Sequence, residues 1–120
     1  MKKILIVEDE VDLLAMLKQR LEHHQYEVLE AYDGEEGLAK VKQGNPDLII
    51  LDVKMPKLDG YTFIKEMRAD KAHAKIPIII LTAHANLDSL FKMEGVSAYF
   101  SKPYEINQVL EAIKKALAKT

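Results

Sequence analysis

Cysteine is absent from the sequence, and its absence removes three classes of chemistry. Without a thiol the chain makes no disulfide, no thiolate metal site and no cysteine nucleophile, and a reducing compartment suits it. The nucleotide-binding patterns GxxxxGK[ST] and GxGxxG are missing as well. If the chain accepts a phosphoryl group, the donor would therefore have to be a partner or a small molecule.

Long apolar runs and an excess of one charge sign are also missing. The 17 basic and 19 acidic residues give a formal net charge of -2, which predicts no direct contact with nucleic acid or an anionic membrane. No stretch approaches the roughly 20 apolar residues of a membrane span. The apolar run 4–7 behind the two N-terminal lysines is too short for a secretory signal. We therefore expect a cytoplasmic protein.

The composition that remains is that of a folded domain. Hydrophobic residues make up 48% and charged residues 30% of the 120 positions, without a long run of like charge. A chain of this length buries a core without disulfides or metals. We expect one domain that covers residues 1–120.

Short apolar runs alternate with segments of helical periodicity along the chain. The predicted strands lie at 3–7, 27–31, 47–51, 76–81 and 97–101. The shorter predicted helices lie at 35–43, 60–69 and 86–93. Strands that are nearly continuous in Ile, Leu and Val favour a parallel sheet covered on both faces. The expected fold is a doubly wound α/β sandwich of three layers, (βα)5, with the flavodoxin-like strand order 2-1-3-4-5.

Two longer helices are predicted by apolar stripes. One stripe comprises Val11, Leu14, Leu17, Lys18 and Leu21, and the other comprises Ile106, Val109, Leu110, Ile113 and Leu117. We expect the core to contain Phe63, Phe91 and Phe100. The histidines show no metal-ligand spacing, and we expect all four on the surface, namely His23, His24, His73 and His84.

Polar side chains follow four of the predicted strands at the point where each strand ends. These residues are Glu8, Asp9, Asp52, Thr82 and Lys102. Because parallel strands end at one edge of a sheet, we expect the five side chains to converge there. Asp52, which ends a strand apolar enough to be buried, is the strongest functional candidate.

Three convergent carboxylates need positive charge nearby. Two like charges about 4 Å apart cost roughly 4 kcal/mol at an effective dielectric near 20. Lys102 supplies one positive charge, and a divalent ion would supply two more. Carboxylate oxygens without His or Cys suit Mg²⁺, for which Mn²⁺ can substitute. A hard cation, an ammonium and a hydroxyl around a carboxylate are equipment for phosphoryl transfer, so Asp52 is a candidate covalent phosphoacceptor.

The order of these motifs resembles that of two-component response regulator receiver domains, and most of all the stand-alone chemotaxis-type regulators. The resemblance covers the whole chain and rests on Glu8-Asp9, Asp52, Met55-Pro56, Asp59-Gly60, Thr82-Ala83, Tyr99 and Lys102-Pro103. It implies that Asp52 is the phosphorylation site. It also implies a Mg²⁺ site formed by Glu8, Asp9, Asp52 and the backbone carbonyl of Lys54.

The same resemblance implies a switch and its partners. Thr82 would be the switch hydroxyl, Tyr99 the switch aromatic and Lys102 the phosphoryl-binding lysine, preceding a cis bond to Pro103. The donor would be a histidine kinase or a histidine phosphotransfer protein, and the output would be binding to a downstream protein target. The expected partner surface comprises Phe91, Lys92, Tyr99, Tyr104, Gln108 and Glu111. No enzymatic activity is expected beyond the chain's own phosphotransfer and dephosphorylation.

Each residue also has a simpler explanation. Glu8 and Asp9 lie where acids favour the start of a helix. Thr82 can be an ordinary residue of a strand end, and Lys102 a solvated loop lysine. Tyr99 can be a half-exposed tyrosine, since Ser97, Tyr99 and Ser101 alternate with apolar neighbours.

Three rival functions keep a related fold. A phosphorylation-independent adaptor is disfavoured by the complete set of polar residues at the strand ends. An aspartate-nucleophile phosphatase needs an acid two residues after the nucleophile, where this chain has Lys54. A flavodoxin-like cofactor carrier needs a loop rich in hydroxyls and glycine after the first strand, and the chain has Glu8-Asp9 there.

Overall fold

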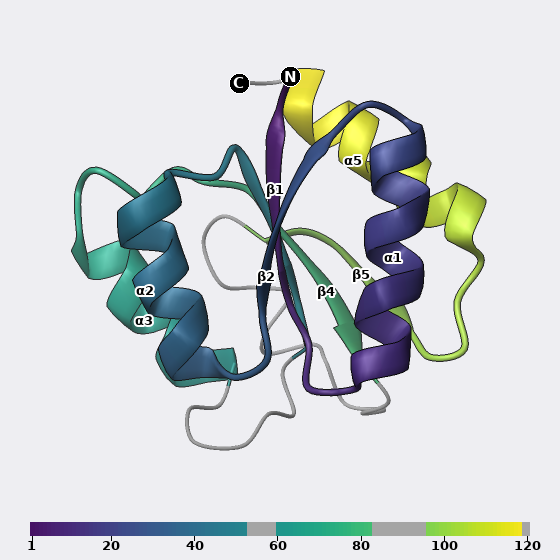
Figure 1. Ribbon diagram of the computed structural model, residues 1–120. Helices are drawn as coiled ribbons and strands as arrows, with labels where there is room; N and C mark the ends of the chain where they lie inside the picture. The colour runs from purple at the N-terminus through teal and green to yellow at the C-terminus, as the bar shows by residue number, and fades with distance from the viewer. Residues whose placement is uncertain (53–59, 83–95, 119–120) are drawn as a thin grey trace.

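A five-stranded parallel sheet forms the centre of the computed structural model, which describes residues 1–52, 60–82 and 96–118 (Figure 1). The strands are β1 (Lys3–Val7), β2 (Glu27–Ala31), β3 (Leu48–Leu51), β4 (Ile78–Thr82) and β5 (Val96–Ser101). Their order is β2-β1-β3-β4-β5, and every neighbouring pair is parallel. The predicted topology is therefore confirmed.

Helices cover both faces of the sheet. They are α1 (Val11–His23), α2 (Gly34–Gly44), α3 (Gly60–Ala69) and α5 (Ile106–Ala118). Figure 1 shows α2 and α3 on one face and α1 and α5 on the other, which makes the three predicted layers. The helix predicted at 86–93 lies outside the described residues.

Side-chain alternation along the strands divides the core into two clusters. In β1, Leu5 and Val7 pack with α2 and α3, whereas Ile4 and Ile6 pack with α1 and α5. The central strands β1 and β3 are buried on both faces, so they are almost continuously apolar. Phe63 is fully buried and Phe100 is partly buried, as predicted, while Phe91 lies outside the described residues.

Three strands differ in their bounds from the prediction. β5 begins at Val96, one residue earlier than predicted. β4 begins at Ile78 and extends to Thr82, whereas the apolar pattern placed it at 76–81. Pro77, directly before it, has no N–H to donate to the ladder. β3 begins at Leu48, because the side chain of Asp47 turns to accept a hydrogen bond from the Lys3 backbone N–H at 2.7 Å.

The apolar stripe of α1 is one residue shorter than predicted. Leu14, Leu17 and Leu21 are buried, but Val11 is 62% exposed, so its assignment to the core-facing stripe was wrong. Val11 is the first residue of the helix, one turn before the residues that reach the sheet. In α5 the prediction holds, since Val109 and Ile113 are buried and Ile106, Leu110 and Leu117 pack against them.

His73 is a second correction, because it is 7% exposed rather than on the surface. Its Nδ1 lies 3.2 Å from Asp70 Oδ2, and its Nε2 lies 3.0 Å from Asn45 Oδ1. The segment after α3 folds back toward the end of α2 and so encloses the ring. The other histidines divide as follows: His23 and His24 are exposed, and His84 lies outside the described residues.

Candidate functional site

Four of the five polar residues predicted to converge meet at one edge of the sheet, namely Glu8, Asp9, Asp52 and Lys102. Two backbone hydrogen bonds continue the sheet ladder into the site. The Glu8 N–H donates to the Ala31 carbonyl and the Asp52 N–H donates to the Val7 carbonyl, both at 3.0 Å. The backbone at Glu8 and Asp52 is thus fixed by the neighbouring strands.

Three carboxylates gather at this edge. Oxygens of Glu8, Asp9 and Asp52 lie within 4.8 Å of one another. Glu8 is 2% exposed and Asp52 is 5% exposed, whereas Asp9 faces solvent. The cluster therefore has a buried floor of two acids and an open side at Asp9.

Lys102 places its ammonium among the acids. Its Nζ lies 3.0 Å from Glu8 Oε1 and 3.3 Å from Asp52 Oδ2, and it donates a hydrogen bond to each. It also lies 3.7 Å from Glu10 Oε1. The bond from Lys102 to Pro103 is cis, as the resemblance implied.

Among the residues that the structure describes, Glu10 lies near this cluster and was not predicted from the sequence. Its carboxylate is exposed and forms an outer ion pair with Lys102. Its backbone N–H donates to Glu8 Oε2 at 3.2 Å, which engages the second oxygen of Glu8. A run of three acids after the first strand was the available signal, but only the first two were considered.

Among the described residues, two acids of this site, Glu8 and Asp52, are buried around one cation, Lys102, and this burial determines their electrostatics. Burial raises the pKa of the Glu8 carboxyl to about 7, against the opposing effect of its hydrogen bond from Lys102. Burial alone would lower the pKa of Lys102, but the hydrogen bond to Glu8 and the charge of Asp52 outweigh it and raise this pKa. Lys102 is thus a permanent cation, and it does not fully compensate the acids around it.

The donor set fits a hard divalent cation. Three carboxylates converge with no sulfur or imidazole among them, which is the oxygen environment that Mg²⁺ and Mn²⁺ prefer. The cluster can therefore hold a metal ion. Helix capping explains less of the arrangement, because the N-cap of α1 is Glu10, whose side chain makes no capping hydrogen bond.

Comparison with known proteins identifies the family. The family model described as the response regulator receiver domain matches residues 4–114. The chain belongs to this family. Response regulators are the signalling proteins of two-component systems, and receiver domains interact with histidine kinases and with downstream effectors.

Relatives and solved structures extend the match. The alkaline phosphatase synthesis transcriptional regulatory protein PhoP of Bacillus subtilis (strain 168) is 40% identical, over 99% of this chain and 50% of its own length. The chain spans about half the length of the first curated relatives it matches. The chemotaxis response regulator CheY4 of Vibrio cholerae has a TM-score of 0.88 and 31% identity, covering 97% of this chain and 98% of its own.

One solved relative contains a magnesium ion. The receiver domain of the sensor histidine kinase PA1611 from Pseudomonas aeruginosa PAO1, with a magnesium ion coordinated in its active site cleft, is 27% identical with a TM-score of 0.87. The match covers 98% of each chain. Within the described ranges of the present chain, no helix is long and apolar enough to cross a membrane.

The remaining predicted residues of this receiver domain lie as follows. Thr82 is the last residue of β4, and its register partner on β5 is Ser101, the neighbour of Lys102. Tyr99 is 38% exposed on β5, with Ser97 and Ser101 exposed on the same side. Lys54, Phe91 and Lys92 lie outside the described residues.

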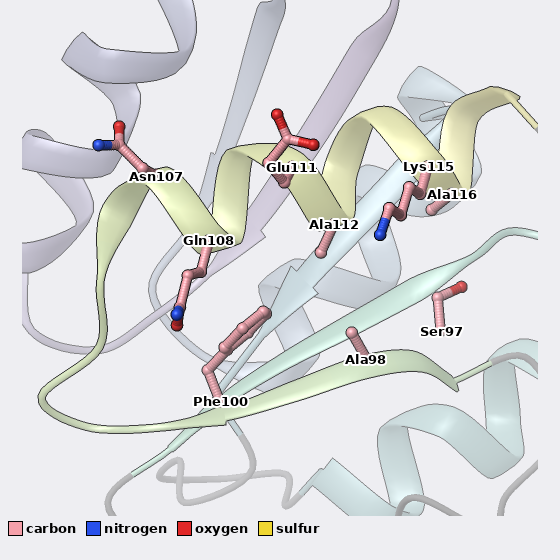
Figure 2. A pocket seen from close by; sticks show the side chains of 9 residues that line it. All are labelled: Ser97, Ala98, Phe100, Asn107, Gln108, Glu111, Ala112, Lys115 and Ala116. Atoms are coloured by element: carbon pink, nitrogen blue, oxygen red, sulfur yellow. The ribbon is translucent and has the colours of Figure 1, made fainter.

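A groove lies between β5 and α5 of the receiver domain. Its volume is about 530 Å³, and its lining includes Phe100 from the strand with Gln108 and Glu111 from the helix. Figure 2 shows the Phe100 ring directed toward α5, while the Glu111 carboxylate points away from the strand. Two of the predicted partner-surface residues, Gln108 and Glu111, therefore line a real depression.

Proposed function

We propose that residues 1–120 act as a single receiver domain in which Asp52 accepts a phosphoryl group and so controls partner binding. The observation that supports this most is the position of Asp52, buried beside Glu8 and within 3.3 Å of the Lys102 ammonium, in a member of the receiver family. A buried carboxylate with a fixed cation beside it matches the family's chemistry better than a helix cap does.

The proposed transfer starts from a phosphohistidine of a histidine kinase or phosphotransfer protein. A carboxylate oxygen of Asp52 attacks the phosphorus, a P–O bond forms, the P–N bond breaks, and the electron pair returns to the imidazole nitrogen. Lys102 then pairs with the phosphoryl oxygens, and the Thr82 hydroxyl donates a hydrogen bond to one of them. Beyond this transfer and the later hydrolysis of phospho-Asp52, which regenerates the carboxylate and releases inorganic phosphate, we propose no enzymatic role for the chain.

A metal ion fits the same proposal. Glu8, Asp9 and Asp52 would hold Mg²⁺ or Mn²⁺, with the carbonyl of Lys54 as a further ligand by family resemblance. When bound, the ion supplies the positive charge that Lys102 alone lacks, and so neutralises oxygens of the phosphoryl group. The magnesium in the cleft of the PA1611 receiver domain supports this assignment.

The proposed output is a graded change of surface. Moving a two-state equilibrium from 1:99 to 99:1 takes about 5.5 kcal/mol of differential stabilisation. One hydrogen bond to a charged group contributes only about 1.5–3 kcal/mol. The Thr82 contact alone is too small for an all-or-none switch, so Lys102 and the metal must contribute. We place the output on the face around β5 and α5, with Tyr99 as the switch aromatic.

The test is phosphorylation by a small donor. We expect the chain, incubated with Mg²⁺ and acetyl phosphate, to gain the mass of one phosphoryl group, because Asp52 is the nucleophile. The Asp52→Asn variant should show no gain, since its amide is not nucleophilic. Intact-mass spectrometry measures both. No gain in either chain would contradict the proposal and favour the phosphorylation-independent adaptor.

A further inference from the structure

Glu10 is the N-cap residue of α1, but its side chain does not cap the helix. Its backbone carbonyl accepts a hydrogen bond from the Leu14 N–H at 3.0 Å, and its backbone N–H donates to Glu8 Oε2 at 3.2 Å. The side chain makes no capping hydrogen bond. Helices prefer Ser, Thr, Asp or Asn at this position, because these side chains reach the N–H groups of the first turn. The backbone of Glu10 is thus fixed on both sides, while the helix does not use its carboxylate.

The Glu10 carboxylate lies instead on the solvent side of Lys102. Glu10 Oε1 is 3.7 Å from Lys102 Nζ, and the Glu10 side chain is 66% exposed. The other two acids that pair with this ammonium, Glu8 and Asp52, are buried. In the described part of the chain, Lys102 therefore has two buried acidic partners and one exposed acidic partner.

The charge of Glu10 matters more for an incoming ligand than for the fold. Exposed ion pairs of this kind stabilise a protein only slightly. The proposed phosphoryl donor is an anion, however, and its oxygens must reach Lys102 and Asp52 from the solvent, where Glu10 lies. Glu10 Oε1 and Asp52 Oδ2 lie 3.7 and 3.3 Å from the same Nζ. Glu10 is therefore within one Debye length of the reacting carboxylate, which is about 10 Å at 0.1 M ionic strength.

We propose that Glu10 is a specificity-determining residue whose negative charge disfavours highly charged phosphoryl donors at Asp52. This inference rests on the proposed function of Asp52. Glu10 acts through its charge and does not touch the reacting atoms. The site therefore favours donors whose own negative charge around the phosphoryl group is small or is balanced by basic groups.

The test compares two small donors of different charge. Acetyl phosphate is a dianion at neutral pH, and phosphoramidate carries one negative charge fewer. With either donor, an Asp52 oxygen attacks the phosphorus and a new P–O bond forms. Acetate leaves with the electron pair of the broken P–O bond, or ammonia leaves with that of the broken P–N bond. Intact-mass spectrometry measures the initial rate of phosphoryl gain, after an NMR titration has established saturation of each chain with Mg²⁺.

Glu10→Gln removes the charge and keeps the size of the side chain. At about 0.1 M ionic strength, we expect its rate with acetyl phosphate to rise about threefold over the parent, and its rate with phosphoramidate to rise less than about twofold, because the repulsion scales with the charge of the donor. At about 1 M, where the Debye length falls to about 3 Å, both gains should nearly vanish. A purely structural role of Glu10 would affect both donors equally and would not depend on salt.

Glu22→Gln is the matched control. Glu22 is an exposed acid near the other end of α1, about 18 Å along the helix from Glu10. Its substitution changes the net charge by the same amount and should leave the rates with both donors at their parental values. Equal rises in the two variants would overturn the assignment to Glu10, because they would reflect the net charge of the molecule.

The outcomes also separate this inference from the proposed function. If the parent gains phosphoryl mass but Glu10→Gln reacts at parental rates, or more slowly with acetyl phosphate, the role of Glu10 is wrong and the phosphoacceptor proposal stands. The same conclusion follows if the rise is equal for the two donors and independent of salt. If the parent gains no mass from either donor, both proposals fail.

Discussion

Glu8 and Asp52 are the only acidic side chains among the described residues that are almost completely buried. A carboxylate removed from water needs a cation or several hydrogen bonds, because otherwise its ionised form costs several kcal/mol. Both acids share the single ammonium of Lys102. Because of this sharing, we expect a phosphoryl group or a metal ion at the cluster to change which of the two acids Lys102 contacts.

Asp70 shows a different use of a carboxylate. It accepts hydrogen bonds from the Ala72 N–H at 3.0 Å and from His73 Nδ1 at 3.2 Å, if that nitrogen is protonated. The pKa of Asp70 is lowered, chiefly by the Ala72 hydrogen bond and further by the charge of His73. Together with Asn45, Asp70 holds the buried ring of His73 and ties the segment after α3 to the end of α2.

Asp70→Ala should lower the free energy of unfolding at neutral pH, and the loss should shrink in acid. The folded carboxyl binds a proton less readily than the unfolded one, so its stabilisation is present above pH 3.8 and is lost as the pH falls through the lower folded pKa. Urea unfolding of parent and variant from pH 7 downward measures the difference. Asp12→Asn, which removes an exposed acid in the first turn of α1, controls for the loss of charge. A pH-independent difference would contradict this account.

In helix α1, apolar side chains become buried only after the first turn. An apolar side chain stabilises the fold little at the first position of the helix and much more one turn later, because only the second reaches the sheet. Leu14 is 1% exposed in the cluster that includes β1 and β3 residues, whereas Val11 is 62% exposed to solvent.

Leu14→Ala should cost about 2–5 kcal/mol of unfolding free energy, since it leaves a cavity in a packed core. Val11→Ala is the matched truncation in the same helix and should change stability by less than about 0.5 kcal/mol. Chemical denaturation monitored by circular dichroism measures both. Equal losses in the two variants would mean that Val11 is buried in solution.

Strand β5 has a similar division along its length. Ala98 and Phe100 face the core and α5, while Ser97, Tyr99 and Ser101 face outward. As the last strand of the sheet, β5 brings Lys102 to the site at one end and lines the groove beside α5 with its inward side chains. One strand therefore connects the acidic cluster with the proposed output face.

At the scale of the whole molecule, the proposed signal must travel from Asp52 to the face around β5 and α5. Phosphorylation of the parent should shift the NMR amide signals of α5 residues such as Gln108 and Glu111. In Tyr99→Ala, Asp52 should still be phosphorylated, but the shifts in α5 should be lost, because the proposed switch aromatic is missing.

Tyr32→Ala provides a closely matched control for this experiment. Tyr32 is 39% exposed and Tyr99 is 38% exposed. Tyr32 lies between β2 and α2, however, and β2 is the edge strand opposite β5. Tyr32→Ala should retain the phosphorylation-induced shifts in α5. If Tyr99→Ala retains them too, Tyr99 is not the switch.

The fold and most of the candidate site could be predicted from local patterns. Apolar runs specify buried parallel strands, and parallel strands necessarily end at one edge, so Glu8, Asp9, Asp52 and Lys102 had to converge. The alternation in β5 likewise predicted the outward position of Tyr99, which the structure confirms.

Tertiary packing alone decided the features that depend on segments distant in the sequence. Asn45 and His73 are 28 positions apart, and their hydrogen bond buries a histidine that local sequence would leave on the surface. Lys102 and Glu8 are 94 positions apart, and the folded chain brings them together. The same folding buries Glu8, which raises its pKa against the opposing effect of the Lys102 hydrogen bond. The sequence by itself determined which chemical groups reach the edge of the sheet, because strand direction depends on local patterns. The packing determined which of them share a proton donor, because Lys102 reaches Glu8 at 3.0 Å and Asp52 at 3.3 Å only when side chains from different strands are brought together.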